Sequence, residues 1–205
     1  MNNTTNRLKE NWQKKNLFGK ITDILIILFI VSLFIPQSRM VVGGFINRVK
    51  AMIIAPSKEA KENIISLTDS DYNWLLTDMN GKEVSLKDSQ GKVIFVNLWA
   101  TWCPPCVGEM PELQELWDKF ETNENFALYL ITNEDHATVQ SFLDKREYNF
   151  PIYISKYKSP EPFQSRSIPT SYIISKTGKI IVKETGAANW GGKKTEKLIR
   201  NLMAE

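Results

Sequence analysis

Cysteine and histidine are scarce in this chain, which has two cysteines and one histidine among 205 residues. Two cysteines are too few for the disulfide framework of a small secreted domain. A structural zinc site needs four ligands, and there is neither a second cysteine pair nor a second histidine to supply them. The one histidine, His136 in "NEDHATVQ", is expected to be a solvated residue at the start of a helix. We therefore predict no metal site.

Clustered positive charge and repeated sequence are also missing. The net charge is +3, and Lys and Arg are scattered rather than gathered into a stripe with interleaved aromatic residues. Because such a stripe is the usual mark of a nucleic-acid interface, we predict no nucleic-acid partner. There is no internal repeat and no low-complexity tract. With 42% hydrophobic residues, the chain can form one domain with a full core, plus an appendage.

The appendage is N-terminal, where the composition shifts sharply. Residues 1–20 are polar and contain five Lys or Arg, and the apolar run "ILIILFIVSLFI" follows at residues 24–35. Extended back to Leu17, this segment is long enough to cross roughly 30 Å of hydrocarbon. We predict a transmembrane anchor at residues 21–38. A cleaved signal peptide is the alternative, but Arg39 stands where small residues would mark a cleavage site.

Charge on the two sides of the anchor predicts its orientation. Five Lys or Arg precede it and residues 36–50 contain three, which favours a cytoplasmic N-terminus and an extracytoplasmic remainder. Residues 40–55 have one apolar helical face, which indicates an amphipathic helix on the outer membrane surface; a second span is the alternative. The predicted organisation is a cytoplasmic N-terminus (1–20), a single-pass inner (cytoplasmic) membrane anchor (21–38), an amphipathic juxtamembrane segment and linker (39–70) and a periplasmic or extracytoplasmic domain (71–205).

Alternating strands and helices are predicted from residue 72 onward. A short strand at residues 72–76 leads to a hairpin that turns at Asn80-Gly81. Residues 92–100, "KVIFVNLWA", are nearly all apolar and predict a strand buried on both faces in the sheet centre. Further helices are expected at 104–120, 136–147 and 193–203, and further strands at 126–132, 150–155, 171–175 and 180–186. This order predicts an α/β fold with a mixed central sheet and helices on both faces.

Both cysteines lie in "WCPPC", three positions apart. A static disulfide at this spacing closes too small a loop to stabilise the fold much, which favours a redox-active pair. Cys103 is expected at the N-terminus of a helix, where free N–H groups and the helix dipole favour its thiolate. Pro104 and Pro105 suit a first helical turn but have no N–H, so the nearest backbone donor to the Cys103 sulfur is that of Cys106. We expect a Cys103 pKa that is lowered but not extreme.

Three stretches resemble the TlpA/ResA-like branch of the thioredoxin superfamily, in the same order: "GKVIFVNLWATWCPPC", "SIPTSYIISKTGKI" and "TGAANW". That branch includes membrane-tethered thiol–disulfide oxidoreductases of the bacterial cell envelope. From Tyr72 to the C-terminus, the resemblance implies a thioredoxin-like fold. It makes Cys103 the attacking thiol and Cys106 the buried resolving thiol, so that their disulfide is the redox centre and no separate cofactor is needed. It also matches Pro169 to the family's cis-proline.

The resemblance further assigns the polar residues around the pair. Thioredoxin has a buried aspartate six residues before its first cysteine, where this chain has Asn97. A proton acceptor must then come from elsewhere, and Glu109, one helical turn beyond Cys106, matches a glutamate of this branch. A surface position is the alternative for Glu109, and Asn97 is expected to satisfy local backbone hydrogen bonds. Trp99 is expected in the core, whereas the substrate-docking surface is expected to contain Trp102, Pro104, Pro105, Ile168 and Pro169.

The implied function is reduction of disulfides in envelope proteins, with electrons restored by a membrane thiol donor and the bilayer holding the anchor. The family suggests apocytochrome c maturation as one task. A peroxiredoxin is disfavoured, because Ala100 and Val96 stand where it needs a Thr or Ser and a Pro. A disulfide-forming oxidant would need a strongly stabilised thiolate, to which two prolines contribute nothing. A binding module without turnover is a third alternative, against which the retained cysteines and Pro169 argue.

Overall fold

The computed structural model describes residues 19–24, 26 and 65–205. The predicted amphipathic segment up to residue 64 and most of the predicted anchor lie outside these residues. Among the residues that are described, no helix is both long and apolar enough to cross a membrane. The anchor at residues 21–38 therefore stays a prediction, and the fold below is that of residues 65–205.

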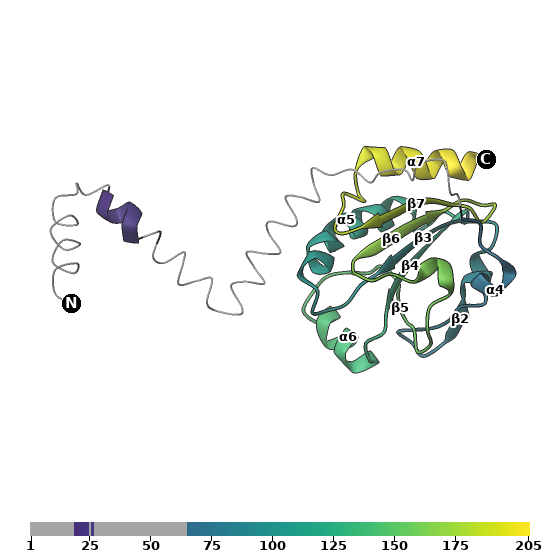
Figure 1. The fold of residues 1–205 in the computed structure, drawn as a ribbon, viewed down its shortest axis with the longest axis horizontal. Coiled ribbons are helices and arrows are strands. Elements are labelled where there is room, and N and C mark those ends of the chain that lie inside the picture. Colours follow the sequence, from purple (N-terminus) through teal and green to yellow (C-terminus); the bar gives the residue numbers. More distant parts are fainter. Residues whose placement is uncertain (1–18, 25, 27–64) are drawn as a thin grey trace. The chain divides into compact units, whose positions relative to one another are not determined.

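Seven strands form one mixed sheet in the order β2-β1-β5-β4-β3-β6-β7 (Figure 1). β3 pairs in parallel with β4, and β4 with β5, whereas the other neighbours are antiparallel. A mixed sheet was expected, and the predicted α/β fold is confirmed. The strands are β1 (Leu75–Asp78), β2 (Glu83–Ser85), β3 (Val93–Leu98), β4 (Phe126–Thr132), β5 (Ile152–Ile154), β6 (Thr170–Ile174) and β7 (Ile180–Thr185).

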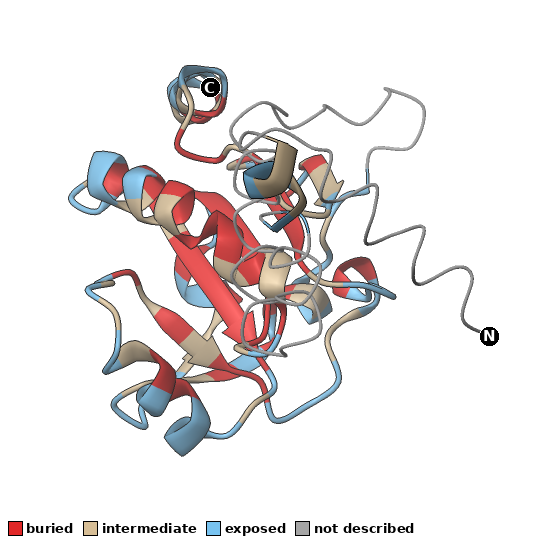
Figure 2. Ribbon diagram, turned by 90° about the vertical axis from the view of Figure 1, so that its left-hand side faces the viewer, coloured by how far each residue is buried: buried red, intermediate tan, exposed pale blue. Residues whose placement is uncertain are grey.

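Helices lie on both faces of the sheet, but unequally. The three longer helices, α5 (Pro104–Phe120), α6 (His136–Leu143) and α7 (Lys193–Ala204), share one core cluster with Phe95 and Leu128 of the sheet. Ile94 and Tyr129 point to the opposite face, since neighbouring strand residues alternate. Short helices cover that second face: α4 (Asp69–Tyr72) and the 3-10 helices η1 (Leu86–Ser89) and η2 (Glu161–Phe163). Figure 2 shows the buried residues concentrated in the sheet and on the inner sides of the helices.

The predictions were closest where hydrophobic pattern and capping agree. Helix 104–120 and strand 126–132 have the bounds that were expected, and the hairpin turn at Gly81 has the positive φ of 82° that favours glycine. The strand predicted at residues 92–100 is shorter in the structure, where β3 begins at Val93 and ends at Leu98. β3 lies inside the sheet between β4 and β6, and its side chains are nearly all buried, as predicted.

Two element predictions were wrong. Residues 72–76 are not one strand: Tyr72 ends helix α4, which starts after Thr68, and β1 begins only at Leu75. The Asp71 carboxylate accepts the Thr68 N–H at 2.8 Å, so "TDSD" is a helix-start signal. The helix predicted to reach residue 147 ends at Leu143. There, the Arg146 guanidinium donates to the Phe142 carbonyl at 3.0 Å and caps the helix.

Candidate active site

The two cysteines form a disulfide at the start of α5, with a Cα–Cα distance of 5.3 Å. Cys103 is the N-cap residue of the helix, and its sulfur accepts the Cys106 N–H at 3.3 Å. Pro104 and Pro105 occupy the first two helical positions, where a missing N–H breaks no intrahelical bond. The Cys106 N–H is therefore the donor that the sequence pointed to. Both cysteines are buried, with exposed fractions of 3% and 1%.

A cis peptide bond faces this disulfide from another part of the chain. The Ile168–Pro169 bond is cis, as the family resemblance implied, and the Ile168 carbonyl oxygen lies 3.8 Å from the Cys103 sulfur. Sheet register explains the approach, because β6 begins at Thr170 and pairs it with Leu98, the last residue of β3. The loop after Leu98, which leads to Cys103, and the loop before Thr170, which contains Pro169, therefore lie at the same end of the sheet. Pro169 is buried and Ile168 half-buried.

Glu109 is the buried carboxyl group of the site and has an exposed fraction of 0%. Its Oε1 accepts the Asn97 side-chain amide at 2.8 Å, and its Oε2 accepts the Trp190 indole N–H at 3.1 Å and the Ala188 N–H at 3.2 Å. Desolvation raises the pKa of Glu109 to about 8, although these three hydrogen bonds favour the ionised form. Since Glu109 follows Cys106 by three helical positions, the two side chains are neighbours on one face of α5.

The surface alternative for Glu109 was wrong, and so was the expected role of Asn97. Asn97 is buried in β3, and its amide bridges Glu109 and the Ser171 hydroxyl rather than bonding to local backbone. Sequence reasoning did not find Trp190 or Ala188 as partners of Glu109. Both lie in "TGAANW", which was noted only as part of the family resemblance. Because burial raises the pKa of Glu109 to about 8, the group is mainly a carboxylic acid at pH 7.

Comparison with known proteins adds to this geometry. A family model described as the AhpC/TSA family matches residues 67–183, more than half of the chain. The chain belongs to this family. Thiol-disulfide oxidoreductase ResA of Halalkalibacterium halodurans is 32% identical over 145 residues, which cover 70% of this chain and 79% of that protein. ResA of Bacillus cereus (strain ZK / E33L) is 36% identical over 115 residues, which cover 56% of this chain and just 66% of that protein.

Solved structures show the same fold. StoA from Bacillus subtilis superposes with a TM-score of 0.50 at 24% identity, covering 64% of this chain and 95% of that one. The exposed lipoprotein thioredoxin Etrx1 from Streptococcus pneumoniae also has a TM-score of 0.50, at 23% identity and with 64% and 98% of the two chains covered. The protein is thus a ResA-like member of the thioredoxin superfamily and an oxidoreductase.

Within this family, the residues before Cys103 matter for the choice of reaction. Position 100 is alanine and position 96 is valine, so the hydroxyl and the proline expected of a peroxiredoxin are missing at these two positions. Sequence reasoning did not find the carboxylate that holds the loop before Cys103. Glu134 accepts both the N–H and the hydroxyl of Thr101 at 2.7 Å. Glu134 follows the end of β4, which pairs in parallel with β3. Residues that follow two neighbouring parallel strands lie at the same end of the sheet, and this was the signal from which the contact could have been predicted.

The predicted docking residues surround the disulfide. Trp102 is 68% exposed and Trp99 only 3%, in agreement with a surface and a core position. Pro104, Pro105 and Ile168 are half-buried. His136 is exposed at the start of α6 and its Nε2 lies 2.8 Å from the Met79 carbonyl. No group of three or more His, Cys, Asp or Glu within the described part of the chain could hold a metal ion.

Proposed function

We propose that this protein is a membrane-anchored thiol–disulfide oxidoreductase that reduces disulfides of proteins in the cell envelope. The observation that carries the proposal is the Cys103–Cys106 disulfide at a helix N-terminus, with the Ile168 carbonyl and cis-Pro169 beside the Cys103 sulfur. Its similarity to proteins named thiol-disulfide oxidoreductase ResA supports the same chemistry.

The first step uses the reduced protein. The Cys103 thiolate attacks one sulfur of the partner's disulfide, forms a mixed disulfide and releases the partner's other sulfur as a thiolate. The helix N-terminus and the Cys106 N–H stabilise the Cys103 thiolate. The Ile168 carbonyl oxygen, 3.8 Å from the Cys103 sulfur, is placed to accept a hydrogen bond from the partner's backbone.

The second step releases the partner. Cys106 must lose its proton before it attacks the Cys103 sulfur, and the Glu109 carboxylate is the acceptor on the same helical face. A carboxyl pKa of about 8 is close to the ordinary thiol pKa of about 8.5. Proton transfer from the Cys106 thiol to the Glu109 carboxylate therefore has only a small free-energy cost. The attack forms the Cys103–Cys106 disulfide and frees the partner's second thiolate. Two electrons and two protons must then come from a membrane thiol donor.

Trapping the mixed disulfide tests this function. In native membranes, a Cys106→Ser variant should accumulate covalent complexes with envelope proteins that a reductant dissolves. The matched Cys103→Ser/Cys106→Ser variant should form none. Complexes of equal amount in both variants, or in neither, would contradict the proposal. If apocytochrome c is a substrate, as the family suggests, it should be among the partners trapped in this way.

We expect electrons to flow from this protein to its partners. No side chain between the cysteines can donate to the Cys103 thiolate, so the reduced form gains little extra stabilisation. We expect a reduction potential nearer to about −270 mV, typical of thioredoxin, than to about −120 mV, typical of a strong oxidant. Equilibration with glutathione buffers measures it. A value at the oxidising end would favour the disulfide-forming alternative.

The anchored, extracytoplasmic location is part of the proposal. It is supported by the apolar run at residues 24–35, the charge bias around it and the need for a compartment in which substrate disulfides persist. Fusions of reporter enzymes after residue 70 should be active only when the reporter works outside the cytoplasm. Activity of a reporter that works only in the cytoplasm would overturn this location.

A further inference from the structure

A groove of about 660 Å³ runs from the redox site toward the loop between β5 and β6. Its near end is lined by Trp102, which precedes Cys103 in sequence, and by Ile168, whose carbonyl oxygen lies 3.8 Å from the Cys103 sulfur. Lys158 and Arg166, from the loop between β5 and β6, are among the residues that line its other part. A disulfide held at Cys103 would therefore place its flanking residues in or over this groove.

Aromatic surface forms one part of the groove. Trp102 and Tyr157 both line it, and their exposed fractions of 68% and 67% are the highest of any large hydrophobic side chain in the described residues. Trp74 and Trp99 line it as well. Exposed aromatic side chains gathered at one place are typical of a protein-binding surface, because they bury much apolar area at low entropic cost.

Unpaired positive charge forms the other part. Lys158 and Arg166 are exposed, and neither makes an ion pair within the described part of the chain. No aspartate or glutamate lines the groove. Glu134 lies close by, but its carboxylate is engaged by Thr101. Three further carboxylates, Asp71, Asp78 and Asp135, line the two neighbouring pockets that Lys158 also lines, and none of them lines the groove itself. The groove is thus apolar and cationic, and complementary to an apolar and acidic ligand.

We propose that this groove selects substrates: it receives an extended partner segment with an aromatic or aliphatic side chain beside the disulfide cysteine and acidic residues close by. The inference rests on the proposed disulfide reduction and names the class of protein segment that the site prefers. Trp102 and Ile168 contact the apolar side chain, and Lys158 and Arg166 attract the carboxylates. Because the two cations are exposed, their main effect is on the rate of encounter.

A panel of model peptides tests the preference. Three disulfide-linked peptide dimers carry phenylalanine beside the cysteine and, farther along, two glutamates, two glutamines or two lysines. The reduced full-length protein, freed of reductant, is mixed with each peptide, and the rate constant of peptide reduction is measured. This value is divided by the rate constant with which dithiothreitol reduces the same peptide, which corrects for differences in the intrinsic reactivity of the peptide disulfides. We expect the glutamate peptide to react about tenfold faster than the lysine peptide at low ionic strength, and the gap to narrow at high salt.

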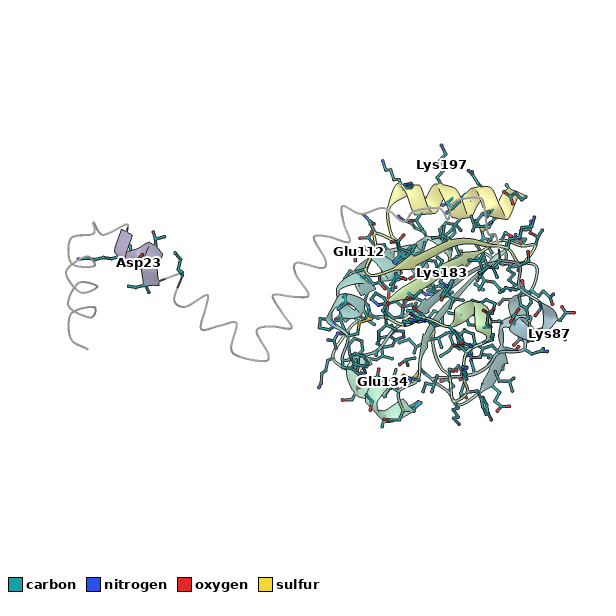
Figure 3. The ribbon with its side chains drawn as sticks, viewed as in Figure 1. Asp23, Lys87, Glu112, Glu134, Lys183 and Lys197 are labelled. Atoms are coloured by element: carbon teal, nitrogen blue, oxygen red, sulfur yellow. A yellow bond between two sulfur atoms is a disulfide. The ribbon has the colours of Figure 1, made fainter. Side chains whose placement is uncertain are left out.

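Matched variants locate the effect. Lys158→Glu/Arg166→Glu should reverse the preference, whereas Lys194→Glu/Lys197→Glu, with the same change in net charge, should keep it. Lys197 lies on the outer side of α7 (Figure 3), and neither lysine lines the groove. Equal normalised rates for the acidic and basic peptides in the unmodified protein would overturn the inference, and so would an equal loss of preference in both double variants. If dithiothreitol reduces the peptides and the protein reduces none, the proposed function itself is wrong.

Discussion

The Trp190 indole N–H donates to Glu109 Oε2 at 3.1 Å, which joins two buried side chains 81 positions apart in the chain. Trp190 lies in the loop before α7, and Glu109 lies inside α5, one turn beyond Cys106. The bond is one of three that favour the ionised form of a carboxyl group whose pKa burial raises. The loop before α7 thereby takes part in setting the protonation state of a group next to the redox pair.

Replacing Trp190 should change the pH dependence of the second exchange step. Trp190→Phe removes one donor to Glu109, so the Glu109 pKa should rise above 8, and resolution of a mixed disulfide should need a higher pH. Stopped-flow rates between pH 6 and 10 measure this. Trp117→Phe is the control for the loss of an indole, because Trp117 packs against the same core cluster and does not line the groove. A shift of the profile in both variants would point to a general packing effect instead.

Glu109→Gln should slow resolution while leaving the first attack almost unchanged. Loss of the proton acceptor next to Cys106 should reduce the rate of resolution by about 100-fold and remove its rise with pH near 8. Because the wild-type group is mainly protonated at pH 7, the Cys103 pKa should change little there. Glu115→Gln, on the exposed side of α5, serves as the control. Unchanged rates of both steps would mean that another group takes the proton.

Stability should also report on Glu109. Its pKa in the folded protein is about 8 against an ordinary value of 4.5, so the folded chain keeps a proton that the unfolded chain loses. This contribution is fully present below about pH 4.5 and is lost as the pH rises to about 8. The free energy of unfolding of the wild type, minus that of Glu109→Gln, should therefore fall by several kcal/mol between pH 4.5 and 8. Urea unfolding of the oxidised proteins measures it; a difference that stays constant with pH would contradict the raised pKa.

Local signals in the sequence were enough for the elements that hold the cysteines. Proline in the first turn and a regular apolar face fixed the bounds of α5, and a run of buried residues placed β3 inside the sheet. The environment of Glu109 could not be found in this way, because its donors Ala188 and Trp190 are 79 and 81 positions away. Only the path of the chain after β7 brings them to α5. The spacing to Cys106 therefore predicted where Glu109 is, but not that it is buried and largely protonated.

The turn before β7 provides a stability test that is independent of the redox site. Gly178 has a φ of 80°, and a Cβ there would lie 2.9 Å from the hydroxyl of the buried Tyr72. Gly81 has nearly the same φ of 82° and open space around it. Gly81→Ala should cost about 1–2 kcal/mol for the backbone conformation alone, and Gly178→Ala should cost clearly more. Equal losses in chemical unfolding would show that Tyr72 moves aside freely.

Cys103 should be the first thiol to be alkylated when the protein is reduced. It caps the N-terminus of α5, where the helix dipole favours its thiolate, whereas Cys106 lies inside the first turn. Brief treatment with iodoacetamide near neutral pH, followed by mass spectrometry of the peptides, measures the ratio. Faster labelling of Cys106 would exchange the roles of the two thiols.

The prolines predict how the Cys103 pKa can be changed. An N-cap side chain accepts hydrogen bonds from the second and third helical residues, and here the second is Pro105, which has no N–H. Pro105→Ala supplies that missing donor, so the Cys103 thiolate should be stabilised and its pKa should fall by about one unit, equivalent to about 1.4 kcal/mol. Pro104→Ala adds an N–H at the first helical position, which does not reach the N-cap side chain, and should leave the pKa close to that of the wild type. The pH dependence of alkylation at Cys103 gives both values. Equal shifts in the two variants would show that the loss of proline rigidity, rather than the new donor, controls the thiolate.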